Sequence, residues 1–124
     1  MAEDRKGFQI NESENGHIQV ADEVLAIIAG LAATEVEGVS SMAGGITKDL
    51  ISRLGMKKLS KGVTVEMGEG GIQIFLSLNI SYGYGIPEVS AKVQEKVKLE
   101  IENMTGFTVS EINVRIADVD MKSL

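Results

Sequence analysis

The sequence predicts an α+β fold of two layers, a mixed β-sheet carrying two main helices on one face, with a short helical insertion. The first observation is the run Val24–Ala33, which contains no polar side chain. It is shorter than the roughly 20 residues that a bilayer requires, so we expect a helix buried within the protein. The second is that apolar residues alternate with polar ones over 63–81, the period of strands. The third is that apolar residues recur at helical spacing over 86–104.

The first part of the folded chain is expected to be a strand, the apolar helix and another strand. A short strand covers 17–20, and Asp22 and Glu23 then place negative charge in the first turn of the helix, where the helix dipole favours it. Gly38 is suited to the left-handed conformation that closes a helix. A strand over 39–42 would complete the first strand–helix–strand unit.

A short helix and a hairpin are expected next. Apolar residues at helical spacing between Ile46 and Leu54 predict the short helix. Beyond it, two alternating strands flank the segment Gly68–Gly71, whose three glycines predict a tight turn. One face of this hairpin is expected to meet a core, and the other to face water.

A long helix and a final strand complete the second strand–helix–strand unit. Pro87 opens the helix and Thr105-Gly106 closes it. We expect its apolar stripe to face the sheet; the members are Ile86, Val89, Val93, Val97, Ile101 and Met104. In the last strand the apolar positions change from odd to even between Val109 and Ile112, which predicts a bulge near Ser110.

The apolar helix is expected to use its two sides differently. Its large residues, Val24, Ile27, Ile28 and Leu31, would cover the sheet. The small residues form a second stripe that permits close approach of another backbone; they are Ala26, Ala29, Gly30 and Ala33. Two alternatives follow: the stripe packs on the long helix of the same chain, or it makes the protein a homo-oligomer through self-association.

Composition limits the classes of function. We expect a polar disordered tail over 1–15, one domain over 16–120 and a short tail over 121–124. The formal net charge of −6 argues against nucleic-acid binding and predicts repulsion from anionic lipid, and we expect no direct membrane insertion. The chain has no cysteine and shows no signal peptide, so we expect a cytoplasmic protein.

One short segment departs from the acidic balance. Five basic residues, Lys48, Arg53, Lys57, Lys58 and Lys61, accompany a single acid, so the segment carries +4 and the remainder −10. The segment is either a solvated helix face and turn, or a docking site for an acidic partner or an anionic ligand. Under the second interpretation the partner-binding residues are Arg53, Lys57, Lys58 and Lys61, and binding would weaken with salt.

A search for catalytic or ligand-binding residues finds no recognised site. His17 is the only histidine, and no pattern typical of a nucleophile, a metal site or a phosphate loop occurs, so we expect no enzyme, cofactor or metal. The Tyr82–Pro87 loop is either an ordinary connection or an anion site at a helix N-terminus. Glu35 and Glu37 oppose the helix dipole, so they either face water or face a cation.

The order of several short motifs resembles the alkaline-shock-protein family of bacterial envelope stress response proteins. The similarity runs from about residue 16 to residue 119, and Ala32–Val39 is particularly similar to the YqhY-like branch. The stretches that carry it are His17–Val24, Ile28–Ala32, Glu35–Val39, Gly62-Val63, Ser81–Gly83, Ile86-Pro87, Val93–Val97, Met104-Thr105, Val109 and Ile112–Val114.

The resemblance implies a small cytoplasmic protein of envelope homeostasis and stress, without established catalytic residues. It also implies protein partners. A membrane-anchored adaptor would hold the protein at the membrane, whereas subunits of acetyl-CoA carboxylase would link it to control of fatty-acid synthesis. We therefore expect a non-enzymatic adaptor or regulator that acts through protein–protein binding. The alternative is a small-molecule or anion-binding regulatory domain that uses the Tyr82–Pro87 loop.

Overall fold

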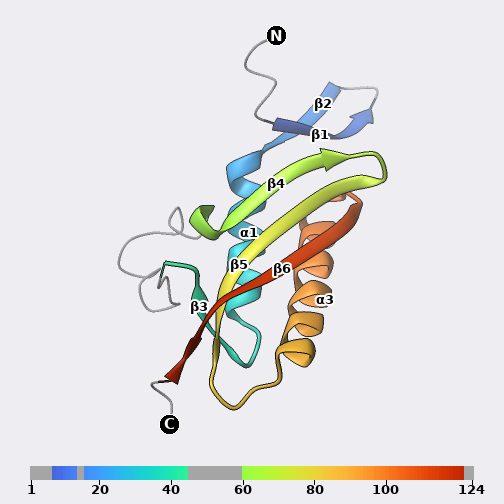
Figure 1. Cartoon of the computed structure of the whole chain (residues 1–124). Helices are drawn as coiled ribbons and strands as arrows, with labels where there is room; N and C mark the ends of the chain where they lie inside the picture. Colours follow the sequence, from blue (N-terminus) through green and yellow to red (C-terminus); the bar gives the residue numbers. More distant parts are fainter. Residues whose placement is uncertain (1–6, 14–15, 45–59, 122–124) are drawn as a thin grey trace.

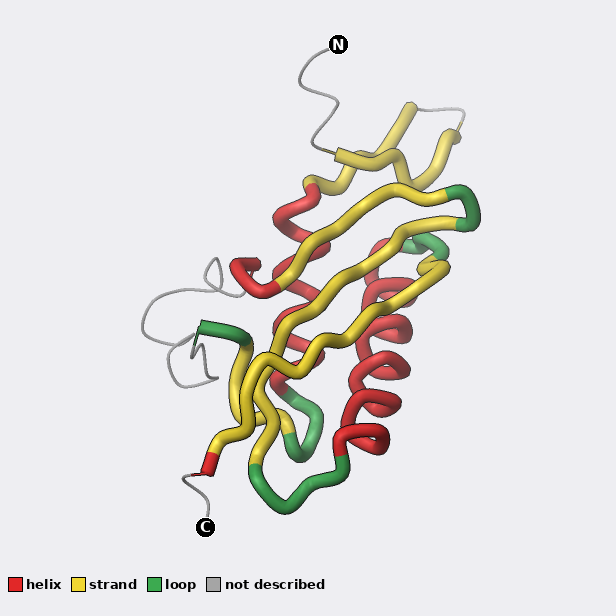
Figure 2. Tube along the Cα trace, viewed as in Figure 1, coloured by secondary structure: helices red, strands yellow, loops and turns green. Residues whose placement is uncertain are grey.

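The computed structural model describes residues 7–13, 16–44 and 60–121, and it has the two layers that the sequence predicts (Figure 1). The elements in chain order are β1 (Gly7–Ser13), β2 (Gly16–Ala21), α1 (Asp22–Thr34), β3 (Val39–Met42), β4 (Val63–Gly68), β5 (Gly71–Ser81), α3 (Ile86–Thr105) and β6 (Val109–Asp120). Both helices lie side by side behind one face of the main sheet (Figure 2). The predicted fold class is confirmed. The predicted short helix over 46–54 lies outside the described residues.

Strand β5 is the centre of the main sheet. Strand β6 runs parallel to it along one edge, from the Ile72–Val109 pair to the Ser81–Asp120 pair. On the other edge, β4 pairs antiparallel with the first half of β5, and β3 pairs antiparallel with its last residues. Gly68 pairs with Gly71, so the predicted hairpin turn is confirmed. The sheet is mixed because the connection from β5 to β6 passes through α3.

The predicted bulge is found at Ser110. Ile72 pairs with Val109 whereas the next residue, Gln73, pairs with Glu111, so no residue of β5 stands opposite Ser110 in the strand register. Its hydroxyl donates a hydrogen bond to the carbonyl of Ile72 over 3.3 Å. The extra residue explains why Val109 and Ile112 are both buried although their numbers differ in parity.

The first strand–helix–strand unit is not joined in one sheet, contrary to the prediction. Strand β2 pairs antiparallel with β1 in a separate two-stranded sheet. Residues 7–13, which the sequence analysis assigns to a disordered tail, form β1. The assignment is wrong there because Phe8 and Ile10 alternate with polar neighbours at the period of a strand, and Ser13 pairs with Gly16 to close a hairpin.

The predicted stripe of α3 is confirmed at its centre and wrong at its ends. Val89, Val93, Val97 and Ile101 are buried against the sheet and α1, and Thr105 continues that face. Ile86 and Met104 are exposed instead. At the C-terminal end of the helix, Thr105 takes the buried position in place of Met104.

The two sides of α1 are exchanged relative to the prediction. Its buried residues are Leu25, Ala26, Ala29, Gly30, Ala32 and Ala33, whereas Val24 is exposed and Ile27, Ile28 and Leu31 are only partly buried. The reason is close packing: α1 contacts α3, β3 and β4 at once, and small side chains permit that approach. The stripe considered for self-association, Ala26, Ala29, Gly30 and Ala33, is therefore filled by the chain itself and is not a surface on which a second copy can dock.

Candidate functional site

The outer face of the helical layer carries an apolar groove between α1 and α3. A cavity of about 250 Å³ is lined there by Ile27, Ile28, Leu31, Ala32, Glu35, Glu100 and Met104. We call this set the helix groove. It exists because α1 is apolar on every side, so some of its apolar residues pack against the edge of the core and remain partly open to solvent. The most exposed of them is Met104, at 64%.

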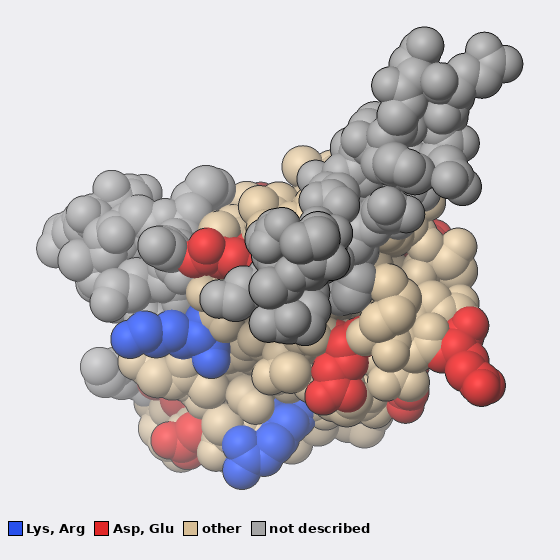
Figure 3. Space-filling view, turned by 90° about the horizontal axis from the view of Figure 1, so that it is seen from above, with Lys and Arg blue, Asp and Glu red and all other residues tan. Residues whose placement is uncertain are grey.

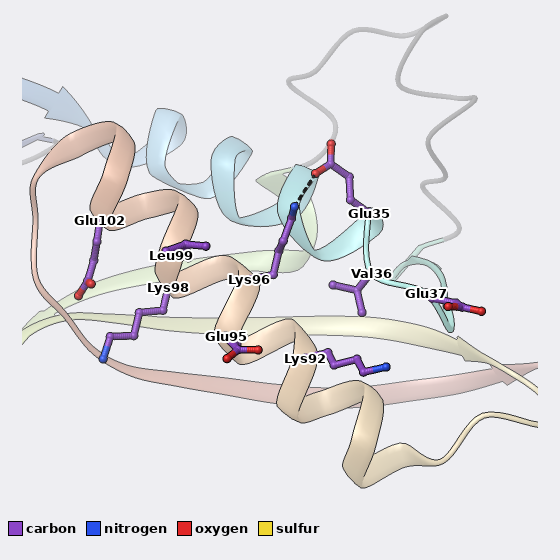
Figure 4. A pocket seen from close by; sticks show the side chains of 9 residues that line it. All are labelled: Glu35, Val36, Glu37, Lys92, Glu95, Lys96, Lys98, Leu99 and Glu102. Carbon is purple, nitrogen blue, oxygen red and sulfur yellow. Dashed lines mark ion pairs between the residues drawn. The ribbon is translucent and has the colours of Figure 1, made fainter.

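An ion-paired lysine marks one end of the helix groove. Lys96 Nζ lies 3.5 Å from Glu35 Oε1 (Figure 4). It also lies 4.0 Å from Glu100 Oε2. The sequence leaves open whether Glu35 faces water or a cation, and the structure places this cation of the same chain beside it. Each side chain is more than one third exposed, so the pairs contribute little to stability and mainly fix side-chain positions.

A larger, shallower hollow of about 540 Å³ extends from this end over the outer surface of α3. Its lining carries carboxylates and ammonium groups in nearly equal number, interspersed along the helix; the residues are Glu35, Val36, Glu37, Lys92, Glu95, Lys96, Lys98, Leu99 and Glu102. The described residues on another face, seen from above in Figure 3, also show basic and acidic side chains interspersed. Neither area has the uniform charge that a polyanion or polycation requires.

The loop between β5 and α3 lies beside the loop that follows α1. The Tyr84 hydroxyl donates a hydrogen bond to Glu37 Oε2 over 3.3 Å. Gly38 has a φ of +100°, and a Cβ there would lie 2.9 Å from Cδ2 of Tyr84, so the tyrosine ring rests on the bare backbone. Glu37 and Tyr84 also line a hollow of about 360 Å³, whose residues are Glu37, Gly83, Tyr84, Gly85, Glu88, Val89 and Lys92.

The carboxylates in this hollow argue against the anion site considered for the Tyr82–Pro87 loop. Glu88 folds back over Gly85 at the start of α3, so closely that a Cβ on that glycine would collide with Glu88 Oε1. Glu37 lines the same hollow. An anion bound at the N-terminus of α3 would meet both negative charges. The loop therefore suits a cationic group better than an anionic one.

The negative charge of Glu37 raises the pKa of Tyr84 above its usual value of about 10, and the hydrogen bond and burial act in the same direction. We expect Glu37→Gln to lower this pKa, since a neutral amide does not oppose formation of tyrosinate. The chain has two tyrosines and no tryptophan, so a Tyr82→Phe background makes Tyr84 the only phenol to follow by tyrosinate absorbance. Glu111→Gln, at the far end of β6, is the control. An unchanged titration in Glu37→Gln would show that Glu37 does not act on Tyr84.

Of the predicted partner-binding residues, the structure describes one. Lys61 is exposed in the turn that leads into β4. Arg53, Lys57 and Lys58 lie outside the described residues, so their docking to an acidic partner stays a prediction. The helix groove is not predicted by the sequence, because the apolar patterns place the large residues of α1, and Met104 of α3, on the sides that face the sheet. The sequence feature that could have indicated the groove is the number of apolar residues in α1. One sheet cannot cover every side of a helix, so some of these residues must lie on another surface.

Two features are absent from the part of the chain that the structure describes. Within it, neither helix combines the length and the apolar character needed to cross a bilayer. Among residues 7–13, 16–44 and 60–121, no three histidine, aspartate or glutamate side chains form a group that could hold a metal ion.

Comparison with known proteins identifies the family. The model of the alkaline-shock-protein-like family, described as having a "cell envelope-related function", matches residues 10–121. The uncharacterized protein YqhY of Bacillus subtilis (strain 168) is 38% identical over 104 residues, which cover 84% of this chain and 77% of YqhY. The Bacillus subtilis protein YloU is 34% identical over 106 residues, 84% of this chain and 88% of YloU.

A third relative carries a functional name. The "stress response regulator gls24 homolog" of Streptococcus pyogenes serotype M3 (strain ATCC BAA-595 / MGAS315) is 29% identical over 108 residues, 86% of this chain and 60% of that protein. No solved structure matches the chain significantly. The family model spans nearly all of the described fold, which confirms the resemblance found in the sequence motifs. The chain belongs to the family of alkaline-shock-like proteins, a family related to the cell envelope and to stress.

Proposed function

We propose that this protein is a non-enzymatic regulator in cell-envelope stress that acts by binding another protein through the helix groove. The observation that carries the proposal is the apolar outer face of α1, where Val24 is 45% exposed and Ile27, Ile28 and Leu31 are only partly covered. The outer face of a helical layer is ordinarily polar, and an apolar groove rimmed by charged residues is typical of a protein-binding site. An amphipathic helix that inserts apolar side chains is a common occupant of such a groove.

The candidate partners come from the family. The resemblance to the YqhY-like branch, together with 38% identity to YqhY itself, makes acetyl-CoA carboxylase subunits the first partner to test, with control of fatty-acid synthesis as the function. A membrane-anchored adaptor is the second, and it would place a cytoplasmic protein at the membrane surface. The basic segment with Arg53, Lys57, Lys58 and Lys61 would supply salt-sensitive docking to either.

The test compares partner binding by the wild-type protein and two matched variants. The partners offered are purified carboxylase subunits and, as a separate fraction, detergent-extracted membrane proteins. Met104→Glu places a charge in the helix groove. Met121→Glu makes the same change at a methionine that is 50% exposed beyond the end of β6. We expect Met104→Glu to lose the partner and Met121→Glu to retain it, since a carboxylate buried in an apolar contact is strongly disfavoured.

The outcomes separate the possibilities. Retention of the carboxylase by the wild type and loss by Met104→Glu supports the link to fatty-acid synthesis, and the same pattern with a membrane protein supports the adaptor role. Equal binding by both variants would contradict the use of the helix groove. Capture of neither class of partner would contradict the proposed function.

A further inference from the structure

Two tyrosines stand exposed at the end of the domain where β5 leads into α3. The backbone N–H of Tyr84 donates to the carbonyl of Ser81 over 3.3 Å, so the residues between form a tight turn. The turn presents Tyr82 at 51% exposure and Tyr84 at 44%. Tyrosine is among the residues that contribute most to protein interfaces, because it offers a large rigid surface with a polar tip. This loop surface lies apart from the helix groove and shares no lining residue with it.

The phenol of Tyr84 is held in place before any partner arrives. Its ring rests on Gly38, where a Cβ would lie 2.7 Å from Cγ2 of Val89 and 2.9 Å from the ring itself. Its hydroxyl is bonded to Glu37. Tyr82 is fixed at its backbone, whose N–H donates to the carbonyl of Asp120 over 2.9 Å. A group with few rotamers to lose binds at lower entropic cost.

The charges beside these rings are mostly negative. Glu37 and Glu88 line the hollow next to Tyr84, and Lys92 is the cation among its lining residues. Asp120 lies next to Tyr82, since its carbonyl accepts the N–H of that tyrosine. The Asp120 carboxylate accepts a hydrogen bond from the Ser40 hydroxyl. A tyrosine face attracts a cation through its π electrons, and a carboxylate beside the ring adds an ionic hydrogen bond.

We propose that this loop surface, formed by Tyr82, Tyr84, Glu37 and Glu88, binds an arginine- or lysine-rich segment of a partner protein. The balance of charge favours this partner over an acidic peptide or a free anion, and the charge of −10 outside the basic segment acts in the same direction at longer range. Arginine suits the site better than lysine, because its planar guanidinium stacks on a tyrosine ring while donating two hydrogen bonds to a carboxylate.

The test measures fluorescence anisotropy of short labelled peptides mixed with the full chain. The probes are alternating arginine–glycine, lysine–glycine and glutamate–glycine peptides, with unlabelled inorganic phosphate as a competitor. We expect the arginine peptide to bind more tightly than the lysine peptide, the glutamate peptide not to bind, and affinity to fall as salt is raised. Glu37→Gln and Tyr84→Leu are each expected to weaken binding of the arginine peptide by about two- to fivefold.

The matched control is Glu111→Gln, which removes the same charge from an exposed position nine residues from Asp120 along β6, or about 30 Å of extended strand. We expect it to leave the affinity unchanged. Equal weakening by Glu111→Gln would show unspecific attraction and overturn the proposal. Absence of peptide binding, or phosphate competing through the same residues, would overturn it as well. Because the helix groove is intact in all these variants, failure here leaves the proposed function untouched.

Discussion

A Gly71→Ala variant is expected to lose at least about 2 kcal/mol of unfolding free energy, because an L-residue in an unfavourable backbone conformation costs about 1–3 kcal/mol and a steric clash adds to it. Gly71 has a φ of +140°, and a Cβ built on it would collide with the carbonyl oxygen of Thr108. The clash is costly because it involves rigid backbone: the same Thr108 carbonyl accepts the N–H of Ile72 over 2.8 Å, next to the bulge where β6 joins the sheet.

Urea unfolding followed by circular dichroism gives the free energy, and Gly83→Ala supplies the control. Gly83 also has a positive φ, of +98°, but a Cβ there meets nothing within 4 Å. It therefore reports the backbone cost without the clash. We expect Gly71→Ala to be clearly the less stable of the two variants. Similar losses in both would show that the chain between α3 and β6 moves aside without cost.

Periodicity predicts the parts of the fold whose faces differ in polarity. In β5 and β6 apolar positions alternate with polar ones, so the buried face and even the extra residue at Ser110 can be derived from the sequence. In α1 the same reasoning fails. When every position from Val24 to Ala33 is apolar, the pattern indicates a buried helix but not its rotation, and the side with the small residues turns inward.

The two candidate surfaces are beyond the reach of sequence patterns because each is assembled from distant segments. The helix groove joins α1 to the end of α3, and the loop surface depends on a hydrogen bond between residues 37 and 84. The sequence does single out Glu35, Glu37 and the Tyr82–Pro87 loop, each as a local irregularity. Only tertiary packing shows that Glu37 and Tyr84 form one surface. It also shows that the cation beside Glu35 is Lys96.

An Ile101→Ala variant is expected to lose about 2–5 kcal/mol of unfolding free energy, the usual range for truncating a fully buried isoleucine. Ile101 is fully buried in the layer between α3 and the sheet. Truncation removes apolar contacts and leaves a cavity that the surrounding strands cannot fill, since β5 is paired along both of its edges. Urea unfolding measures the loss.

Leu99→Ala on the same helix is the matched control. Leu99 is 53% exposed. Its truncation should therefore change the unfolding free energy by no more than about 0.5 kcal/mol. Both variants end in alanine, and leucine and isoleucine differ in helix propensity by only a few tenths of a kcal/mol, so the difference between the variants mainly reports burial. If Leu99→Ala were as destabilising as Ile101→Ala, the outer surface of α3 would be part of the core, and the rotation of α3 described above would be wrong. If only Ile101→Ala destabilises, the charged outer surface of α3 is left open to a partner without loss of the fold.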